Sequence, residues 1–418
     1  MRTTILLFVL SIITSGATAQ LALGRALPLP SGKFNIGYHR FEWTDTSRKE
    51  ILSASTRNRS VVADIWYPTE NAGGVTVHYL DTMAAYRAFG ARGLRLLLGT
   101  TGAALIRSGN IRTHAKERAP FDHRLKTSPV IFFSHGMGMI TQVYTTQIED
   151  LVSHGYTVVA LTHPYDAWLA SLQDSSLILF EKKQREAAGT SEEQQITYEN
   201  KRVEWWAADI RFALDQLAYL NRKESDIPFA GHLDLSRVGA MGHSVGGRAA
   251  ARACQLDARI RSCADQDGVV MMMPFYPGPD GTGMKQPFLL FERDRITPPT
   301  DEELKSMGMS RQEVETLVAR LRANRDAVLA ATGGSYRVVL HFDSSTHMSF
   351  SDLPILQAST NAEAALASRV LQVTCRYTLE FFDKTLRGIS APLYEGKEQL
   401  NYIDLVRRYP KAGNTKHR

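Results

Sequence analysis

The sequence predicts an α/β fold in which a mostly parallel, doubly wound sheet carries helices on both faces. Short, continuous apolar runs recur along the chain, and such runs are typical of strands buried on both faces of a parallel sheet. Segments with helical spacing of apolar residues separate them, and this alternation indicates strand–helix–strand units. The chain has 418 residues, 44% hydrophobic and 22% charged, which is the composition of an ordinary globular protein with a large core.

Each predicted element follows from its local pattern. The early strand Ser60–Tyr67 is largely apolar and ends at a proline, Pro68, while Pro129–Phe133 and Gly155–Leu161 are nearly continuous apolar runs. The predicted strands, in chain order, are Asn35–Trp43, Ser60–Tyr67, Pro129–Phe133, Gly155–Leu161, Arg237–Met241, Ile260–Ala264, Pro287–Phe291 and Tyr336–Phe342, the last of which closes the sheet. The predicted helices are a glycine-interrupted segment over Asp81–Ile111, Thr141–His154, Val203–Leu220 and the small-residue stretch Arg248–Ala251.

The first residues have the pattern of a signal peptide. Arg2 precedes an apolar run from Ile5 to Ile13, and small residues ending in Ala17–Ala19 follow it. The run is short for a membrane span, which is the competing interpretation. We therefore expect residues 1–19 to be removed and the protein to be secreted or periplasmic. In such a compartment two of Cys254, Cys263 and Cys375 could pair, although burial as small hydrophobic residues is the favoured interpretation for Cys254 and Cys263.

One motif carries chemistry. Gly242-His243-Ser244-Val245-Gly246 fits G-x-S-x-G between the strand that ends at Met241 and the following helix. In this strand–turn–helix context the serine lies on a sharp turn, exposed as a nucleophile, and the fold is then an α/β-hydrolase fold. A tight turn with a capping serine is the alternative interpretation. The motif predicts a serine hydrolase with Ser244 as its nucleophile.

The nucleophile needs a base and an acid, which in this fold follow it along the chain. His347 lies in the loop after the last predicted strand, whereas its rival, His341, falls inside that strand. Asp267 follows Ile260–Ala264 and precedes a glycine, which suits a loop at the end of a strand. Asp265 would point to the same side of an extended segment, and Asp294 follows the next strand, so both remain alternatives to Asp267.

The transition state also needs backbone donors for a developing oxyanion. The N–H of Val245, directly after the nucleophile, is one candidate. The other is Met137, because Ser134-His135-Gly136-Met137-Gly138 follows an early strand and its glycines let the backbone turn an N–H inward.

These motifs resemble those of the secreted platelet-activating factor acetylhydrolase family, the lipoprotein-associated phospholipase A2 type. The resemblance extends from Trp66-Tyr67-Pro68 to His347 and is densest over Pro129–His163. In that family the acid lies 23 residues after the nucleophile, as Asp267 does after Ser244. The resemblance implies an α/β-hydrolase fold, a Ser244–Asp267–His347 triad, no metal or other cofactor, and hydrolysis of short or oxidised sn-2 acyl esters of phospholipids.

The chain departs from the family pattern after Asp267, in the histidine loop and over Asp166–Asn200, which weakens the substrate assignment. A general carboxylesterase, a polyesterase or a dienelactone-hydrolase-like enzyme is therefore an alternative, and a non-catalytic binding protein on the same fold is a hypothesis of another class. We expect residues 20–418 to form one domain with insertions near 81–118, 166–200 and 300–331, and a further loop insertion over Met271–Lys285, placed where insertions shape a substrate pocket or lid.

Net charge is +6, and the excess is concentrated between Leu80 and Lys126. This stretch holds nine basic residues: Arg87, Arg92, Arg95, Arg107, Arg112, Lys116, Arg118, Arg124 and Lys126. A solvated helical excursion is the simplest interpretation, and peripheral contact with an anionic lipid surface is the functional one. No aromatic platform accompanies the charge, so nucleic acid is not an expected partner.

Overall fold

The computed structural model describes residues 27–409 except 54–55, 72, 110, 182–188, 190–191, 223–225, 269–283, 294–300, 302–303, 305–307, 333 and 343. The predicted signal peptide, most of Met271–Lys285, and Asp294 therefore lie outside the described residues. In the described part of the chain, no helix is both long and apolar enough to pass through a membrane.

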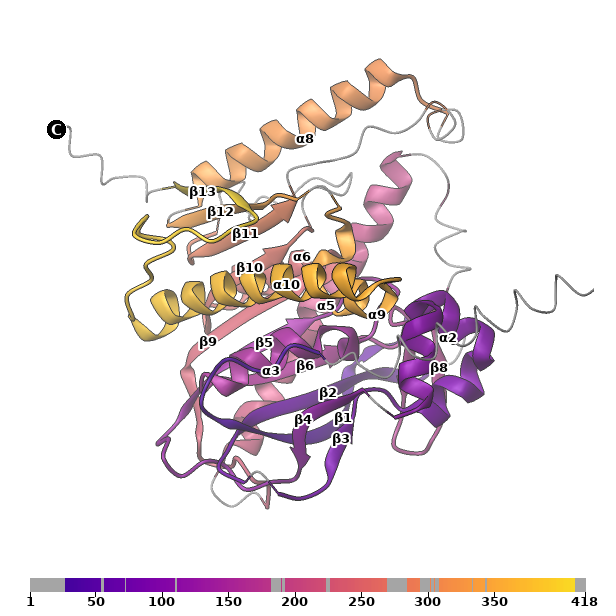
Figure 1. Cartoon of the computed structure of the whole chain (residues 1–418), viewed down its shortest axis with the longest axis vertical. Coiled ribbons are helices and arrows are strands. Elements are labelled where there is room, and N and C mark those ends of the chain that lie inside the picture. Colours follow the sequence, from indigo (N-terminus) through magenta and orange to yellow (C-terminus); the bar gives the residue numbers. More distant parts are fainter. Residues whose placement is uncertain are drawn as a thin grey trace, which may run out of the picture.

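Eleven strands form one large sheet, with the order β13-β12-β11-β10-β9-β5-β6-β2-β1-β4-β3 (Figure 1). Neighbours from β6 to β12 in this order are parallel, and β2, β1, β3 and β13 add antiparallel pairings at the two ends. The strands are β1 (Asn35–Lys49), β2 (Asn58–Thr69), β3 (Thr76–His78), β4 (Arg112–Glu117), β5 (Ser128–Ser134), β6 (Thr157–Thr162), β9 (Leu233–His243), β10 (Ile260–Gln266), β11 (Phe288–Arg293), β12 (Ser335–Leu340) and β13 (Ile403–Tyr409). A separate hairpin is formed by β7 (Leu169–Ser171) and β8 (Leu177–Leu179).

The predicted parallel sheet is confirmed, and each predicted strand corresponds to one of these. Its continuous apolar runs are buried along their whole length in β5 and β6, as strands covered on both faces must be. One expectation was wrong: Tyr336–Phe342 does not close the sheet. β13 pairs antiparallel with β12 and forms the edge, and Asp404, Arg407 and Arg408 interrupt its apolar residues, so it lacks the continuous apolar run of the buried strands.

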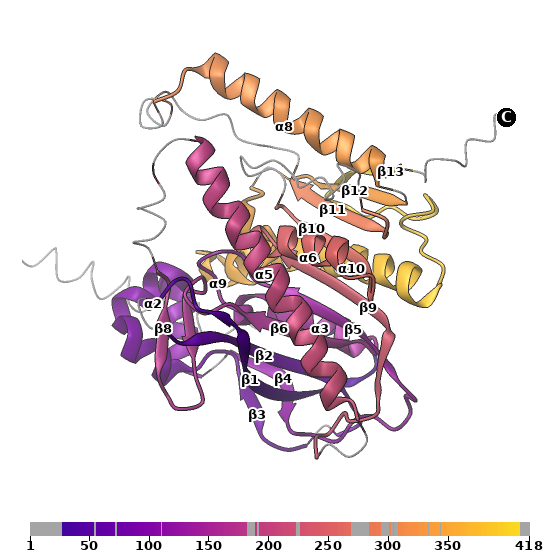
Figure 2. The ribbon, with the colours of Figure 1, turned by 180° about the vertical axis from the view of Figure 1, so that it is seen from behind.

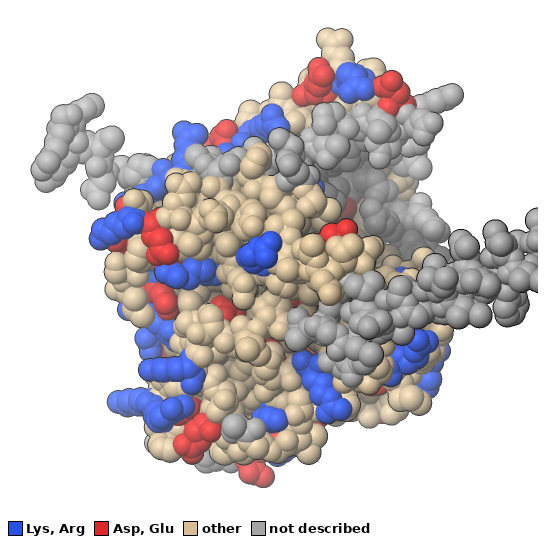
Figure 3. Space-filling model, in the orientation of Figure 1, with Lys and Arg blue, Asp and Glu red and all other residues tan. Residues whose placement is uncertain are grey.

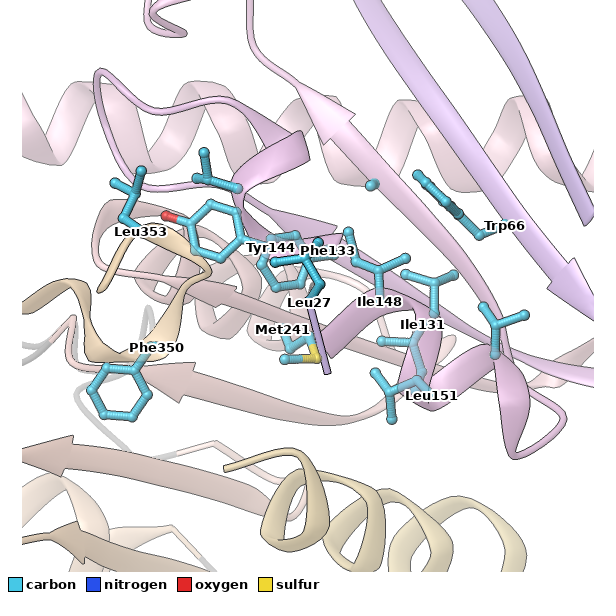
Figure 4. Close-up of a cluster of buried hydrophobic side chains, with 14 of the residues drawn as sticks. Leu27, Trp66, Ile131, Phe133, Tyr144, Ile148, Leu151, Met241, Phe350 and Leu353 are labelled. Atoms are coloured by element: carbon cyan, nitrogen blue, oxygen red, sulfur yellow. The ribbon is translucent and has the colours of Figure 1, made fainter. Parts of the chain in front are cut away.

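Helices cover both faces of the sheet. On one face α3 (Thr145–Ser153), α9 (Leu353–Gln357) and α10 (Asn361–Phe382) pack over a core that includes Phe133, Tyr144 and Met241 (Figure 4). On the other face α5 (Glu192–Leu220) and α6 (Val245–Leu256) pack over Phe132, Ala240 and Leu290, and α5 crosses the back of the sheet (Figure 2). Cys254, Cys263 and Cys375 are buried free thiols, as expected for Cys254 and Cys263.

The remaining helices only partly follow the sequence expectations. The predicted Thr141–His154 helix begins with a 3₁₀ turn, η1 (Thr141–Tyr144), and α5 begins eleven residues before the predicted Val203. The glycine-interrupted segment is α2 (Thr82–Arg107), which is kinked at Gly90 and Gly99 where φ is 60° and 71°. The charged segment 300–331, predicted as an insertion, contains α8 (Arg311–Ala331), while α10 was not predicted.

Candidate active site

The G-x-S-x-G motif forms a sharp turn between β9 and α6. Ser244 has φ 57° and ψ −124°, a left-handed conformation that costs a non-glycine residue about 1–3 kcal/mol. Its N–H donates to the Gln266 carbonyl at 2.8 Å, which ties the turn to the end of β10. The side chain is nearly buried, with 9% exposed, at the wall of a small cavity.

Two glycines make this turn sterically feasible. A Cβ on Gly242 would lie 2.5 Å from the Gly246 backbone, and a Cβ on Gly246 would lie 2.2 Å from the Ser134 carbonyl oxygen. These neighbours are backbone atoms that cannot move aside cheaply. The motif glycines therefore permit α6 to start in direct contact with β5.

Asp267 and His347, the predicted acid and base, are in contact. Asp267 follows the end of β10 with φ 57°, and its Oδ2 accepts from His347 Nδ1 at 2.6 Å. His347 begins the 3₁₀ turn η2 (His347–Phe350), which is closed by reciprocal hydrogen bonds between Thr346 and Ser349. Because Nδ1 is held by the carboxylate, Nε2 is the ring nitrogen left to accept a proton from a nucleophile.

Asp267 has a further cationic partner that sequence reasoning missed. Arg293, at the end of β11, donates through Nε to Asp267 Oδ2 at 2.8 Å, and its backbone N–H lies 3.3 Å from Oδ1. The Asp267 N–H also donates to the Phe291 carbonyl at 2.8 Å. Three donors, His347 Nδ1, Arg293 Nε and the Arg293 N–H, thus hold the buried carboxylate in place.

Asp265, one of the two alternatives to Asp267, has a different hydrogen-bond partner. Its Oδ1 accepts from the Gly268 N–H at 2.9 Å, and burial raises the pKa of its carboxyl well above the ordinary value. The expectation that Asp265 and Asp267 share one side of an extended segment was wrong, because the backbone leaves the strand conformation at Asp267. Asp294 is outside the described residues.

His341 does not lie inside a strand, as the sequence had predicted. β12 ends at Leu340, so His341 follows the strand rather than lying within it, and its N–H donates to the Tyr402 carbonyl at 2.8 Å.

The two expected oxyanion donors, Met137 and Val245, lie beside Ser244 and His347. All four residues line a cavity of about 160 Å³, together with Gly136, Met139, Glu199, His243, Arg248, Gly268 and Met348. Val245 is the first residue of α6, where backbone N–H groups have no acceptor within the helix and the helix dipole favours negative charge. A developing oxyanion would find donors at this end of the cavity.

A second missed pair, Tyr144 and His243, joins the two loops of the site. The Gly136 N–H donates to the Tyr144 hydroxyl at 3.2 Å, and that hydroxyl lies 2.8 Å from His243 Nδ1. His243 Nε2 donates to the His347 carbonyl at 2.8 Å. Burial lowers the pKa of His243 well below its ordinary value, which keeps the ring neutral and suits one accepting and one donating nitrogen. The signal in the sequence was the histidine that precedes Ser244.

The wall of the cavity next to α6 is charged. Arg248, one helical turn after Ser244, is buried and donates to Glu199 Oε2 at 3.1 Å and to Asn200 Oδ1 at 3.0 Å. Both partners belong to α5, so part of the segment 166–200, the predicted insertion, reaches the site. The arrangement as a whole places a strained serine, a carboxylate-oriented imidazole and backbone donors around one cavity, which is suited to acyl transfer.

The chain is similar to known esterases along most of its length. A model of the family described as platelet-activating factor acetylhydrolase, isoform II, matches residues 24–387. A probable 1-alkyl-2-acetylglycerophosphocholine esterase of Arthroderma benhamiae is 25% identical over 287 residues, covering 67% of this chain and 68% of the relative. A platelet-activating factor acetylhydrolase of Cavia porcellus is 27% identical, covering 56% of this chain and 53% of the relative, so the match spans about half of that animal protein.

A solved structure supports the fold. A ferulic acid esterase from Streptomyces cinnamoneus superposes with a TM-score of 0.67 and 22% identity, covering 91% of this chain and 99% of that one. At this identity the likeness bears on the α/β-hydrolase architecture alone.

Proposed function

The chain belongs to the platelet-activating factor acetylhydrolase, isoform II, family, and on this premise we propose that it is a serine hydrolase that cleaves carboxylic esters. The observation that carries the proposal is the 2.6 Å contact between Asp267 and His347 beside the same cavity as Ser244. In the proposed mechanism Ser244 attacks the ester carbonyl, and His347 takes its proton and returns it to the leaving alcohol. Asp267 fixes the tautomer of His347 and stabilises the imidazolium.

The tetrahedral intermediate and its breakdown complete the cycle. The N–H groups of Met137 and Val245 donate to the oxyanion, and loss of one such donor typically costs about 3 kcal/mol of transition-state stabilisation. The intermediate collapses to an acyl-enzyme on Ser244 as the alcohol leaves. Water, activated by His347, then releases the acid and restores the serine.

The proposed substrates are phospholipids with a short or oxidised sn-2 acyl group. Support comes from the relatives, whose names give them the hydrolysis of platelet-activating factor or of 1-alkyl-2-acetylglycerophosphocholine. The proposed location is outside the cytoplasm, on the basis of the N-terminal signal-peptide pattern.

Peripheral contact with lipid through α2 is part of the proposal. Met83 and Leu96 on this helix are 72% and 78% exposed, and Arg87, Arg92, Arg95 and Arg107 on the same helix are also exposed. Figure 3 shows basic side chains over this part of the surface. Exposed apolar residues together with arginines are the composition of a surface that meets anionic lipid.

The mechanism is tested with Ser244→Ala. The variant is expected to keep its folded structure, as measured by circular dichroism, and to lose hydrolysis of p-nitrophenyl acetate and labelling by a fluorophosphonate probe. Substantial residual turnover in Ser244→Ala would refute the assignment, and a wild-type protein that the probe does not label would favour a non-catalytic binding protein.

The substrate class is tested separately with a panel of esters. We expect phosphatidylcholines with short sn-2 acyl groups to be hydrolysed faster than those with long ones. Activity confined to soluble esters would reject the phospholipid assignment and leave a general carboxylesterase.

A further inference from the structure

A second serine–histidine–aspartate arrangement lies buried behind the loop that carries Met137. His163 Nδ1 lies 2.8 Å from Asp209 Oδ2, and His163 Nε2 lies 3.2 Å from Ser134 Oγ. All three residues are fully buried, so no substrate reaches this serine. The arrangement must therefore have another role than covalent catalysis.

Two arginines fix Asp209 from the opposite side. Arg59, itself fully buried, donates from Nη2 to Oδ2 at 2.7 Å and from Nε to Oδ1 at 3.2 Å, and Arg48 Nη2 donates to Oδ1 at 2.8 Å. Glu50 accepts from Arg59 at 2.7 Å, and Asp45 accepts from Arg48 at 2.6 Å, so each arginine bridges Asp209 to a second carboxylate. Burial alone would raise the pKa of Asp209, but the arginines and His163 outweigh it and hold the pKa below the ordinary range. The carboxylate is thus a fixed, ionised anchor.

The two histidines next to this anchor are neutral, and their protons can be assigned. Burial lowers the pKa of His163, and it lowers the pKa of His135 to about 3. His163 Nδ1–H then donates to Asp209, which leaves Nε2 to accept from Ser134. His135 Nδ1–H donates to the Gly136 carbonyl at 2.7 Å, and its Nε2 accepts the backbone N–H of His163 at 3.2 Å. Every ring nitrogen of the pair has a partner.

Residues that follow His163 along the chain make the contacts that hold the oxyanion loop, defined as residues 136–139. The Gly138 N–H donates to the Asp166 carbonyl at 2.8 Å, and the Trp168 N–H donates to the Met139 carbonyl at 3.0 Å. Trp206 stacks on His163 with ring centroids 4.1 Å apart and donates to Asp166 Oδ2 at 2.8 Å. The segment from His163 to Trp168 is therefore a rigid support on one side of the loop.

The other side of the loop meets the nucleophile turn. A Cβ on Gly246 would lie only 2.2 Å from the Ser134 carbonyl oxygen and 2.4 Å from the His135 carbonyl oxygen. The backbone of Ser134 and His135 is thus packed between the first turn of α6 and the His163 cluster. Displacement of His163 would change the separation between the Met137 and Val245 N–H groups.

We propose that Asp209 and His163 are positioning residues that set the geometry of the oxyanion loop. The inference rests on the proposed function, because it requires Met137 to donate to an oxyanion. An oxyanion site is effective only when its donors are preorganised, and errors well below 1 Å weaken it.

The test substitutes His163→Asn, which retains a donor near the position of Nδ1 for Asp209 and removes the group that accepts from Ser134. Hydrolysis of p-nitrophenyl acetate is compared with that of its thionoester, whose thiocarbonyl sulfur accepts hydrogen bonds poorly. We expect kcat for the oxygen ester to fall about 10- to 100-fold with KM within about twofold, and the ester-to-thionoester rate ratio to shrink by a similar factor.

A matched control is His114→Asn. His114 also pairs with a buried carboxylate, through Nδ1 and Glu149 Oε2 at 2.6 Å, but in the packing of β4 against α3, outside the candidate active site. This variant is expected to lose stability in urea denaturation while the ester-to-thionoester ratio stays at the wild-type value.

Three outcomes would overturn the proposal. The first is an unchanged kcat in His163→Asn. The second is an equal loss of kcat on the ester and the thionoester, which indicates a general structural role. The third applies if His163→Asn does not fold: Ser134→Ala removes only the hydroxyl that bonds to His163, and an unchanged ester-to-thionoester ratio in that variant would also overturn the proposal. Failure of the proposed function is recognised independently, by full activity in Ser244→Ala.

Discussion

At the scale of single residues, two residues of the candidate site have strained backbone conformations. Ser244 and Asp267 both have φ 57°, and neither is a glycine. Such strain persists only where neighbouring contacts over-determine it, and it is found most often at functional sites. Here the contacts are the hydrogen bonds from the Ser244 N–H to Gln266 and from the Asp267 N–H to Phe291, which tie both turns to the ends of neighbouring parallel strands.

The two neighbouring carboxyls predict opposite results for the same substitution. Asp267→Asn removes the carboxylate that orients His347, and we expect kcat for p-nitrophenyl acetate to fall on the order of 10³- to 10⁴-fold. Asp265→Asn is the matched variant. Since burial already favours the neutral form of Asp265 and an amide oxygen can still accept from Gly268, its kcat is expected to stay within about threefold of wild type. The reverse ranking in steady-state kinetics would make Asp265 the acid.

Asp352 predicts a pH dependence of stability. Burial raises the pKa of this carboxyl, which accepts from the Tyr79 hydroxyl at 3.0 Å, to about 7. A raised pKa means that the folded state holds a proton which the unfolded state loses near pH 4. The stabilisation is therefore complete below that pH and is lost as pH rises towards 7.

Asp352→Asn removes this ionisation. Between pH 5 and pH 8, the free energy of unfolding of wild type relative to the variant should fall by about 3 kcal/mol in urea denaturation. Asp215→Asn, at an exposed carboxylate that pairs with Arg259, serves as the control. The free energy of unfolding of wild type relative to this variant should change little between pH 5 and pH 8. A wild-type-minus-Asp352→Asn difference that does not vary with pH would contradict the assignment.

At the scale of elements, the start of α6 against β5 decides the geometry of the site. The first turn of α6 contributes Ser244, the Val245 N–H and Arg248 to one cavity, while β5 and its following loop contribute Gly136 and Met137. This close approach is possible because Gly246 has no side chain, and the atoms that a Cβ would meet belong to the backbone of Ser134 and His135.

Gly246→Ala should force these two elements apart. We expect kcat to fall at least about 100-fold, because the oxyanion donors separate, and the free energy of unfolding to fall by about 1–3 kcal/mol, as for overpacking in a core. Gly73→Ala is the control, since a Cβ there would meet only the side-chain oxygen of Asn71 at 3.3 Å. Wild-type kinetics in Gly246→Ala would show that the close approach is not needed.

At the scale of the whole molecule, α2 lies next to the carboxyl ends of the parallel strands, where the candidate site is. Phe89 on α2 stacks on Trp168, which follows β6, with ring centroids 4.0 Å apart, and Gly99 on α2 packs against Gln357 on α9, which follows the His347 loop. A lipid surface that met the exposed side of α2 would therefore lie near the carboxyl ends of the parallel strands, where such folds place their sites.

A double variant, Met83→Ser with Leu96→Ser, tests this arrangement. Both side chains are exposed, so folding and hydrolysis of p-nitrophenyl acetate should be unchanged. Binding to anionic phospholipid vesicles in a sedimentation assay should weaken about tenfold or more, because burial of each large apolar side chain contributes about 1.5–3 kcal/mol. Ile389→Ser, in the segment that follows α10, is a control for loss of an exposed apolar side chain elsewhere, since Ile389 is 49% exposed. Unchanged vesicle binding in the double variant would exclude α2 as the contact.

Most of the parallel sheet could be predicted because its signal is local. A strand buried on both faces, such as β5 or β6, must be apolar along its length, and the nucleophile turn needs glycines at fixed spacing from Ser244. β13 and α10 were not predicted. Charged residues interrupt the apolar residues of β13, so it lacks the continuous run of a buried strand, whereas α10 does carry the amphipathic spacing of a helix and could have been found from it.

The sequence by itself determined the order and type of the candidate catalytic residues: Ser244 on its turn, His347 after the last parallel strand, and a choice among three carboxyls. Only the tertiary structure decided that Asp267 contacts His347, that Arg293 and the Tyr144–His243 pair hold these loops, and that Asp209 lies behind the oxyanion loop. The physical reason is that these contacts join residues far apart along the chain. Their partners are set by strand register, by helix packing and by one left-handed φ at Asp267, none of which leaves a local pattern in the sequence.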